Sequence, residues 1–505
     1  MSVPLYDPKN LWAMPSHTFN EWRATNDLPL LFAYFETKLP GFSKWLDTLP
    51  ISREMALRVV PTGDLFHGNE VKTLIERRRE YTDSNRIEIF DSTTQDAKTY
   101  WEIRGEQAIV LGKFEPYLIW AKKTLGEARF IVSDALNSGR SDSFVFGLWS
   151  GSSPGVLPRA HLFKEFAVLK LGSSLLNGFI DFGNRNLDFT DLDFLQVRDA
   201  QFASAWANIS FSSCREIDIC NSRIAFIRFR ECVASDFSVE ASTLQDIYFE
   251  ESDVNDLRVT NAKIYRMSFD KSRVTPYITN SDIREFRFFP PPNTPPSAIA
   301  TTYRLLRSAY QSTGMRRESA DSYYHERIFE RKSYFKPYLN YENRNLFPQM
   351  HYGGSIFQVF RMRRTGTLPK KDLIKALRLA FGARLKLWFQ PKSFVNLARF
   401  KLKWLASVVE YLLWGYGERP FRIALVAGLV IGTYATAYRF MSWPGRPSLD
   451  WVDSLYFSVV TFTTLGYGDI APLTTALKIV TASEALFGAF FIGLVVAGFS
   501  NRARY

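Results

Sequence analysis

Seven residues near the end of the chain carry the clearest chemistry in the sequence, Thr463-Thr464-Leu465-Gly466-Tyr467-Gly468-Asp469. Gly466 and Gly468 lack a Cβ atom, so the backbone can take angles that turn its carbonyl oxygens to one side. A ring of such oxygens can replace the water around a dehydrated potassium ion. The pattern predicts that Thr464, Leu465, Gly466 and Tyr467 bind K⁺ and that Gly468 completes the filter segment. The Thr464 hydroxyl would close the innermost site, and Tyr467 would pack outward as a spacer.

Two apolar segments flank these residues and are long enough to cross a bilayer. The first runs from Phe421 to Met441 and the second from Leu473 to Phe499, and each is near the roughly 20 residues that a membrane helix needs. Residues 450–463 are too short to span a membrane and too apolar for an ordinary loop, which predicts a re-entrant helix buried in protein. Its C-terminal end would direct partial negative charge at the ion. In the alternative reading Gly-Tyr-Gly is a plain turn, but a turn does not require two flanking spans.

The segment from Trp451 to Asp469 resembles the pore loop of tetrameric potassium channels. That family has the pattern Thr-Val-Gly-Tyr-Gly-Asp after a pore helix with two adjacent aromatic residues, here Tyr456 and Phe457. Leu465 replaces the usual valine, at a position that contributes a carbonyl group and points its side chain away from the ion. Val460 stands where many bacterial relatives carry a glutamate, which argues against filter inactivation of that type.

The resemblance implies a homotetramer, because one chain supplies one loop and a ring needs four. It places Asp469 at the outer mouth and Thr463 at the cavity, with Tyr456 and Phe457 supporting the filter. Glu484 in the second span is an ionisable residue at membrane depth, which by default indicates a functional site. We expect it behind the filter as a hydrogen-bond acceptor.

Two glycines in the second span have two readings each. Gly488 and Gly493 could let an inner helix bend and so act as gating hinges. Small residues in membrane helices also permit close helix packing, and the sequence leaves both readings open.

Lysine and arginine residues predict the orientation of the spans. Five lie in the stretch from Arg399 to Arg422 before the first span, and Arg502 and Arg504 follow the second. Positive charge favours the cytoplasmic side, so both termini should be cytoplasmic in a multi-pass protein of a bacterial inner membrane. Residues from Met1 to His17 have neither the basic start nor the apolar core of a signal peptide.

A five-residue period occupies the middle of the chain. Every fifth residue from Ile209 to Val274 is uncharged, and the positions two residues earlier are small or apolar. This period fits neither a helix nor a simple strand, so it predicts a solenoid with short sides. The pattern resembles the pentapeptide-repeat family, a square right-handed β-helix with four fives in each coil. An upstream run from Leu187 to Phe202 has the same period shifted by two residues, which predicts an extra coil interrupted by a bulge or loop.

Prolines between residues 290 and 296 should end the repeat, because proline cannot donate to the ladder. Two helical stretches follow, joined around Gly314, and they predict a helical hairpin. This hairpin is similar to the helical pair of bacterial pentapeptide-repeat ion channels, and the run from Tyr416 to Pro420 before the first span fits the same family.

The net charge of +12 is concentrated in one stretch. Residues 361–404 contain thirteen Lys or Arg and one acid, with apolar residues at helical spacing from Ile374 to Trp388. An amphipathic helix of this kind can lie at a membrane surface and bind anionic lipids. A solvated helix docked on the cytoplasmic domain is the alternative, and we do not expect nucleic acid as a partner.

The N-terminal region, residues 1–165, predicts a mixed α+β domain, with a helix around residues 71–81 and strands near residues 87–90 and 108–111. Its role could be that of a cap for the solenoid or of a domain that senses an unidentified cytoplasmic ligand. There is no phosphate-binding glycine motif in spite of Gly147, Gly151 and Gly155, and we find no catalytic constellation or metal-ligand spacing. We therefore expect neither an enzyme nor a cofactor, with K⁺ as the permeant ion.

The sequence thus predicts a multidomain protein. We divide it into an N-terminal α+β region (1–165), a pentapeptide-repeat solenoid (166–290), a helical hairpin (291–345), a basic juxtamembrane segment (346–410) and a two-span α-helical pore domain (411–505). The leading function is a homotetrameric K⁺ channel regulated by its cytoplasmic assembly. The alternative is a membrane-anchored scaffold whose solenoid binds a macromolecular partner. No repeated-arginine voltage sensor is present.

Overall fold

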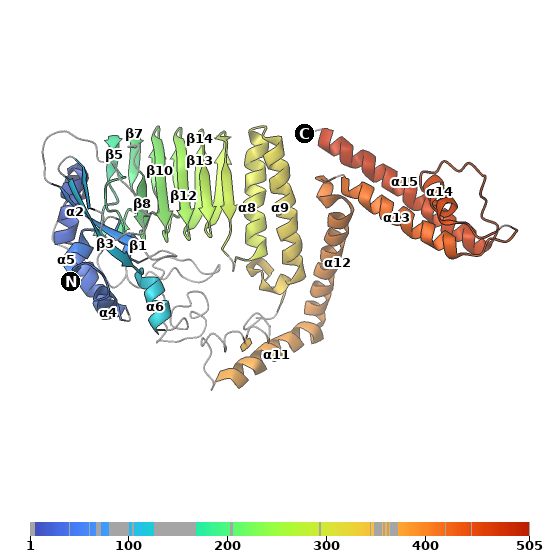
Figure 1. The fold of residues 1–505 in the computed structure, drawn as a ribbon, viewed down its shortest axis with the longest axis horizontal. Coiled ribbons are helices and arrows are strands. Elements are labelled where there is room, and N and C mark those ends of the chain that lie inside the picture. Colours follow the sequence, from blue (N-terminus) through green and yellow to red (C-terminus); the bar gives the residue numbers. More distant parts are fainter. Residues whose placement is uncertain are drawn as a thin grey trace. The chain divides into compact units, whose positions relative to one another are not determined.

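The computed structural model describes residues 6–39, 41–59, 61–66, 72–79, 100–103, 106–125, 168–202, 206–291, 294–343, 345–347, 356, 359–360, 363, 372–419, 421–445 and 447–503. The chain divides into two units, Met1–Ala298 with Pro348–Phe389 and Ile299–Phe347 with Gln390–Tyr505. Figure 1 shows both units and labels many of their elements.

Short helices open the first unit: α1 (Pro8–Ala13), α2 (Ser16–Thr25), α3 (Leu28–Lys38), α4 (Phe42–Leu46) and α5 (Arg53–Leu57), followed by the 3-10 turn η1 (Thr62–Leu65). Asp7 caps α1 and Ser52 caps α5, since each side chain accepts a hydrogen bond from the backbone of the first turn. Phe35 and Phe66 are fully buried in the aromatic core that these helices share.

A three-stranded antiparallel sheet follows, in the order β1 (Lys72–Arg79), β3 (Glu106–Phe114) and β2 (Tyr100–Ile103), with α6 (Tyr117–Leu125) after it. The predicted helix over residues 71–81 is wrong, because this segment is β1 and satisfies its backbone groups by pairing with β3. Tertiary pairing of this kind overrides helix propensity. The strand predicted at residues 108–111 lies in β3, whereas residues 87–90 and the three glycines at 147, 151 and 155 lie outside the described residues.

Short parallel strands over residues 169–289 form a β-solenoid, the green to yellow ladder of Figure 1. The strands are β4 (Leu169–Lys170), β5 (Leu175–Ile180), β6 (Thr190–Asp191), β7 (Gln196–Phe202), β8 (Ala207–Ser210), β9 (Asp218–Cys220), β10 (Arg223–Arg230), β11 (Ser238–Glu240), β12 (Thr243–Glu250), β13 (Asp253–Thr260), β14 (Lys263–Ile264), β15 (Met267–Asp270), β16 (Arg273–Thr279), β17 (Asp282–Ile283) and β18 (Phe286–Phe289). Ile219 pairs with Val239, and Val239 with Val259, so one coil comprises four of the five-residue repeats.

The chain of the solenoid turns once in every five residues, which explains the five-residue period of the sequence. Every fifth residue from Phe211 to Asn261 has a positive φ of 49–60°. A left-handed conformation costs a non-glycine residue about 1–2 kcal/mol, and the parallel ladders and the buried interior offset this cost. Four such turns fit into each coil. The right-handed sense of the coil and membership of the pentapeptide-repeat family remain predictions.

The spacing changes at both ends of the solenoid. Val197 pairs with Ile219, which lies two positions beyond the regular spacing, and this agrees with the predicted two-residue shift of the upstream run. Val259 pairs with Ile278, one position short of the regular spacing, after a register irregularity in β13 and β16. The regular repeat therefore occupies the middle coils.

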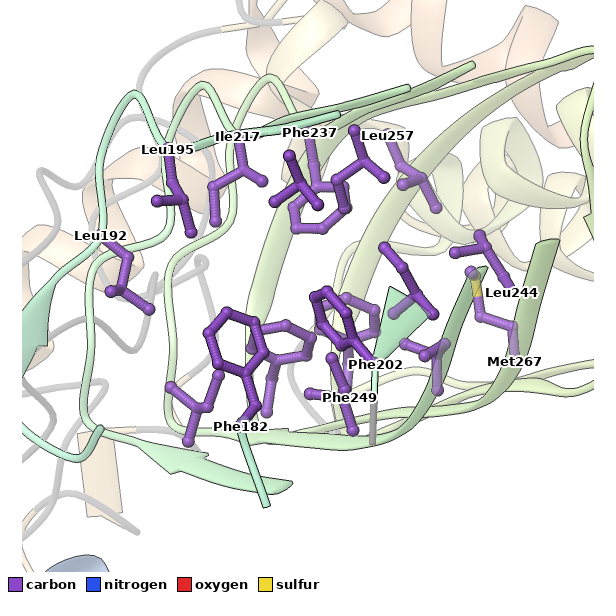
Figure 2. A pocket seen from close by; sticks show the side chains of 17 residues that line it. Phe182, Leu192, Leu195, Phe202, Ile217, Phe237, Leu244, Phe249, Leu257 and Met267 are labelled. Carbon is purple, nitrogen blue, oxygen red and sulfur yellow. The ribbon is translucent and has the colours of Figure 1, made fainter. Parts of the chain in front are cut away.

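Apolar side chains from successive coils fill the solenoid (Figure 2). They surround a cavity of about 30 Å³ that is lined only by apolar side chains. Buried serines satisfy the backbone at the edge of this core: the Ser252 hydroxyl accepts from the Cys232 N–H at 3.1 Å and donates to the Glu250 carbonyl at 2.9 Å. An apolar cavity without polar partners stays dry, so the interior is a packed apolar core.

The N-terminal helices pack against the first coils of the solenoid. Phe66 contacts Phe189 with a ring separation of 5.0 Å, and Phe189 stacks on Phe211 of the next coil. The buried Asp188 carboxylate accepts hydrogen bonds from the backbone N–H groups of Gly63 at 2.7 Å and Ser210 at 2.6 Å, and burial raises the pKa of Asp188 to about 6. The α-helical part of the N-terminal region is therefore joined to the solenoid by both apolar and buried polar contacts.

The second unit begins with the helical hairpin that the sequence predicts. Its helices are α8 (Pro296–Ser312) and α9 (Arg316–Phe335), and Gly314 between them has a φ of +73°. The two helices are held by ion pairs from Arg304 and Arg307 to the buried Glu326, at 2.8 and 3.1 Å. The 3-10 turns η3 (Pro337–Leu339) and η4 (Tyr341–Asn343) follow.

The remaining helices are α11 (Leu373–Phe389), which belongs to the first unit, and α12 (Pro391–Trp414), α13 (Phe421–Phe440), α14 (Trp451–Phe462) and α15 (Thr475–Ala503) of the second. The 3-10 turn η7 (Gly415–Gly417) connects α12 to α13. Within the described residues two segments are long and apolar enough to cross a membrane, Phe421–Phe440 and Thr475–Gly498. They agree with the two predicted spans, and α14 is the predicted short helix between them.

Gly63→Ala should weaken the junction between the N-terminal helices and the solenoid. An added Cβ would lie 2.5 Å from the Ser210 Cβ and 2.7 Å from its hydroxyl, so one element must move. We expect a loss of about 1–3 kcal/mol, measured as a lower melting temperature of the first unit. Gly382→Ala in α11 is the control, because its Cβ meets no atom within 4 Å. Equal melting temperatures of the two variants would contradict the close contact.

Candidate functional site

The sign of φ alternates along the backbone that follows α14. Asp450 begins α14 by accepting from the Asp453 N–H at 2.7 Å, and the helix ends at Phe462. Thr464, Gly466 and Gly468 have φ values of 58°, 56° and 81°, whereas φ is negative at Leu465 and Tyr467 between them. Alternation between left- and right-handed backbone regions turns successive peptide groups the same way, which suits a row of carbonyl oxygens.

The start of this segment is anchored to the end of α14. The Thr464 N–H donates to the Thr461 carbonyl at 3.0 Å, and the Leu465 N–H donates to the Val460 carbonyl at 3.0 Å. The Thr463 hydroxyl donates to the Val459 carbonyl at 2.7 Å. These bonds fix where the helix ends and the extended segment begins. In the single chain the side chains of Leu465 and Tyr467 are exposed.

Glu484 lies where three helices meet. Its side chain is fully buried, and its carboxylate accepts a hydrogen bond from the Tyr438 hydroxyl of α13 at 2.6 Å. The Ser458 hydroxyl of α14 is hydrogen-bonded to the same carboxylate. Glu484 thus accepts hydrogen bonds from both neighbouring helices. A buried carboxylate with both oxygens bonded can hold α13, α14 and α15 together; its role in supporting the filter stays a prediction.

The adjacent aromatic residues Tyr456 and Phe457 point to different neighbours. Tyr456 is partly exposed, and the Asp469 carboxylate lies near enough to its hydroxyl to act on it electrostatically. Phe457 is buried against the rings of Tyr438 at 4.8 Å and Trp443 at 5.4 Å. Phe457 therefore packs between the helices, and the support of the filter by either residue stays a prediction.

The two candidate hinge glycines differ in their surroundings. A Cβ on Gly488 would lie 1.8 Å from the carbonyl oxygen of Phe462, where α14 ends, whereas a Cβ on Gly493 would meet no atom within 4 Å. Gly488 therefore lets α15 approach the base of the predicted filter closely. This contact does not test whether either glycine bends during gating.

Sequence reasoning missed the partners of Glu484 and one further site. Ser458 and Tyr438 could have been suspected as hydroxyl groups in otherwise apolar helices. The further site is the elbow, which we define as residues Gly415–Arg419 between α12 and α13. From the sequence, the run from Tyr416 to Pro420 indicates only a similarity to pentapeptide-repeat ion channels.

Tyr416 in the elbow has a positive φ of 60° and is buried, and its hydroxyl is hydrogen-bonded to the Ser407 hydroxyl at 3.1 Å. Burial raises the pKa of Tyr416. A non-glycine residue keeps this conformation only where its surroundings hold it. The elbow is therefore a fixed turn at the start of the first predicted span.

Arginine side chains of the hairpin and the elbow meet around tyrosine rings. Arg327 of α9 pairs with Glu410 of α12 at 2.9 Å. Arg331 of α9 lies 4.0 Å from the centre of the Tyr411 ring, and Arg419 of the elbow lies 4.4 Å from that of Tyr324 on α9. Such contacts are worth about 0.5–2 kcal/mol each. They connect the hairpin to the helix that precedes the first span.

Part of this chain is similar in sequence to known proteins. A family model described as Ion channel matches residues 425–505. Two-pore potassium channel 5 of Arabidopsis thaliana is 38% identical over 77 residues, which is 15% of this chain and 19% of the plant protein. Two pore potassium channel b of Oryza sativa subsp. japonica is 36% identical over 85 residues, 16% of this chain and 24% of that protein. The chain thus spans about a fifth to a quarter of the length of these plant relatives.

A smaller relative is matched over most of its length. Potassium channel protein kcv of Paramecium bursaria Chlorella virus 1 is 44% identical over 88 residues, which is 15% of this chain and 87% of the viral protein. The similarity therefore covers nearly a whole viral protein and only a small part of this chain.

Gly488→Ala should destabilise the packing of α15 on α14, because the new methyl group would overlap a backbone carbonyl that cannot rotate away. We expect a loss of about 1–3 kcal/mol and a lower melting temperature of the detergent-solubilised protein. Gly493→Ala is the matched control in the same helix and should melt like the parent. If Gly488→Ala melts no lower than Gly493→Ala, the close approach is not present in the folded protein.

Proposed function

The chain belongs to the potassium channel family, and we propose on that basis that four copies of it form a channel selective for K⁺. Thr464, Leu465, Gly466 and Tyr467 supply backbone carbonyl oxygens to dehydrated K⁺, and Asp469 lies at the outer mouth. The observation that carries this proposal is the alternating backbone from Thr464 to Gly468, which begins where α14 ends and lies between two membrane-length helices. Such a row of carbonyls replaces the hydration shell of the ion.

Both termini are cytoplasmic in this proposal, and the protein is a multi-pass protein of a bacterial inner membrane. Positive charge before α13 and beyond the apolar part of α15 supports that orientation. K⁺ is the transported ion and no reaction is catalysed. One chain contributes one filter segment, so the ring is complete only in the tetramer.

The cytoplasmic part regulates the pore in this proposal. The contacts between α9, α12 and the elbow support a mechanical route, since the elbow connects α12 directly to α13. Arg422 at the start of α13 also donates to the Tyr411 carbonyl at 3.0 Å, and its guanidinium lowers the pKa of the Tyr411 phenol. A shift of the hairpin would thus be passed to the first span. The stimulus that moves the hairpin is an unidentified ligand.

Potassium flux into liposomes reconstituted with the purified protein tests the proposal. We expect flux for the intact chain and for a shortened chain that begins near Leu405. Absence of flux in both would favour the membrane-anchored scaffold, whose solenoid binds a macromolecular partner.

Gly466→Ala should abolish K⁺-selective flux. A methyl group disfavours the left-handed angle of this residue by about 1 kcal/mol or more and narrows the space for four inward-facing carbonyls. Gly445→Ala is the matched control, because Gly445 also has a positive φ, of 81°, but lies in the loop between α13 and α14. Both variants should lose some stability, and only Gly466→Ala should lose selectivity. Retained preference for K⁺ over Na⁺ in Gly466→Ala would count against the filter assignment.

Arg327→Gln and Glu410→Gln should each change the open probability of reconstituted single channels, and the double variant should resemble either single variant. The pair is partly exposed, so its interaction is worth about 0.2–1 kcal/mol, which predicts a change of up to about fivefold in the ratio of open to closed channels. The control pair is Glu54 of α5 and Arg58, the residue that follows this helix; they are 2.9 Å apart on the surface of the first unit. Strictly additive effects of the Arg327 and Glu410 substitutions would exclude this coupling.

A further inference from the structure

Helix α11 (Leu373–Phe389) has two apolar faces of different kinds. One face consists of Ala376, Ala380, Ala383 and Leu387, which recur every three or four residues and are buried. Ala376 and Ala380 pack with Val359 in a small apolar cluster. This face of α11, made mainly of alanines, is therefore the face that packs against the rest of the protein.

Larger apolar side chains lie on the other face. Ile374 is 77% exposed, Phe381 57% and Leu385 39%, and they are spaced by seven and four residues, which places them on one side of a helix. Trp388 follows on the same side. Large apolar side chains gathered on an exposed helix face indicate an interaction surface.

The charge of α11 indicates the chemistry of the partner. The helix contains Lys375, Arg378, Arg384 and Lys386 and no acidic residue. By helical geometry the first two and Lys386 border one side of the large apolar face, and Arg384 borders the other. None of the four forms an ion pair with a carboxylate among the residues that the structure describes. Cations beside large apolar side chains fit anionic headgroups above an acyl layer.

The chain connection keeps α11 near the bilayer. Helix α12 follows α11 directly and has 24 residues, a length of about 36 Å, and the elbow then leads into α13. With the seven connecting residues added at up to about 3.5 Å each, the end of α11 is tethered within about 60 Å of the point where the first span enters the membrane. An anionic lipid surface is within reach of this helix in every copy.

We propose that α11 lies in the cytoplasmic membrane interface, with Ile374, Phe381 and Leu385 among the acyl chains and its four cations on anionic lipid headgroups. The helix then fastens the cytoplasmic unit to the bilayer at a second place besides the spans. This inference rests on the proposed membrane function and adds a lipid-binding surface to it.

Spin labels on the full-length protein in lipid nanodiscs test the contact. Phe381→Cys reports the large apolar face, Ala380→Cys the protein-packed face, and Glu240→Cys an exposed solenoid position, in a background with Cys214, Cys220 and Cys232 replaced by alanine. In nanodiscs that contain phosphatidylglycerol, the label at 381 should collide several-fold more with oxygen, relative to a water-soluble nickel chelate, than the label at 240.

Two results at position 381 would overturn the proposal. A label with the same collision ratio as the label at 240 would mean that the face is solvated. A label shielded from both reagents, as expected at 380, would mean that protein covers the face, either a second copy or another part of the chain. In both cases α11 does not lie in the lipid.

The charges are tested in the same nanodiscs. Replacing Lys375, Arg378, Arg384 and Lys386 by glutamine, or replacing phosphatidylglycerol by phosphatidylcholine, should move the label at 381 toward the aqueous phase. A depth that is insensitive to both changes would overturn the anionic part of the inference.

Potassium flux of the same labelled proteins separates this inference from the proposed function. Flux without lipid contact at 381 would refute the interfacial helix alone. Lipid contact without flux would refute the channel alone.

Discussion

A potassium ion gives up its water only where oxygen atoms already stand at the distance that water occupied. Backbone carbonyls can supply them only if successive peptide groups turn the same way, which requires residues of alternating handedness. In this chain Thr464, Gly466 and Gly468 carry that conformation. In the proposed function this segment is the filter, so the rest of the second unit must hold it in place.

Three contacts meet this requirement by different means. Backbone bonds from Thr464 and Leu465 fasten the segment to the last turn of α14. Glu484 of α15 is hydrogen-bonded to a hydroxyl group of α13 and to one of α14, and so joins the three helices. Gly488 brings α15 against the carbonyl of Phe462, which leaves no room for the end of α14 to retreat. All three contacts thus hold the C-terminal part of α14, the helix that leads into this segment.

The sequence could predict the parts that have a regular residue spacing or an apolar stretch of characteristic length. Hydropathy located both spans because a bilayer has a fixed thickness, and the spacing of uncharged residues located the solenoid because each chain turn takes five residues. The strand β1 was mistaken for a helix because its pairing partner, β3, is distant in the sequence and lies beyond β2. Tyr438 and Ser458 could not be assigned to Glu484 because the meeting of three helices has no sequence period. The left-handed backbone conformation of Tyr416 could not be predicted either, because no local sequence rule requires it of a tyrosine.

The first unit is built on repeated chain turns, whereas the second contains the two helices of membrane length. The proposed K⁺ selectivity depends on the filter segment in the second unit. The most direct measurement is the reversal potential of single channels in a planar bilayer with K⁺ on one side and Na⁺ on the other. If the pore passes K⁺ and excludes Na⁺, the reversal potential should lie close to the value expected for K⁺ permeation alone. A reversal potential near zero, or no single-channel current from the purified protein, would contradict the proposed K⁺-selective filter.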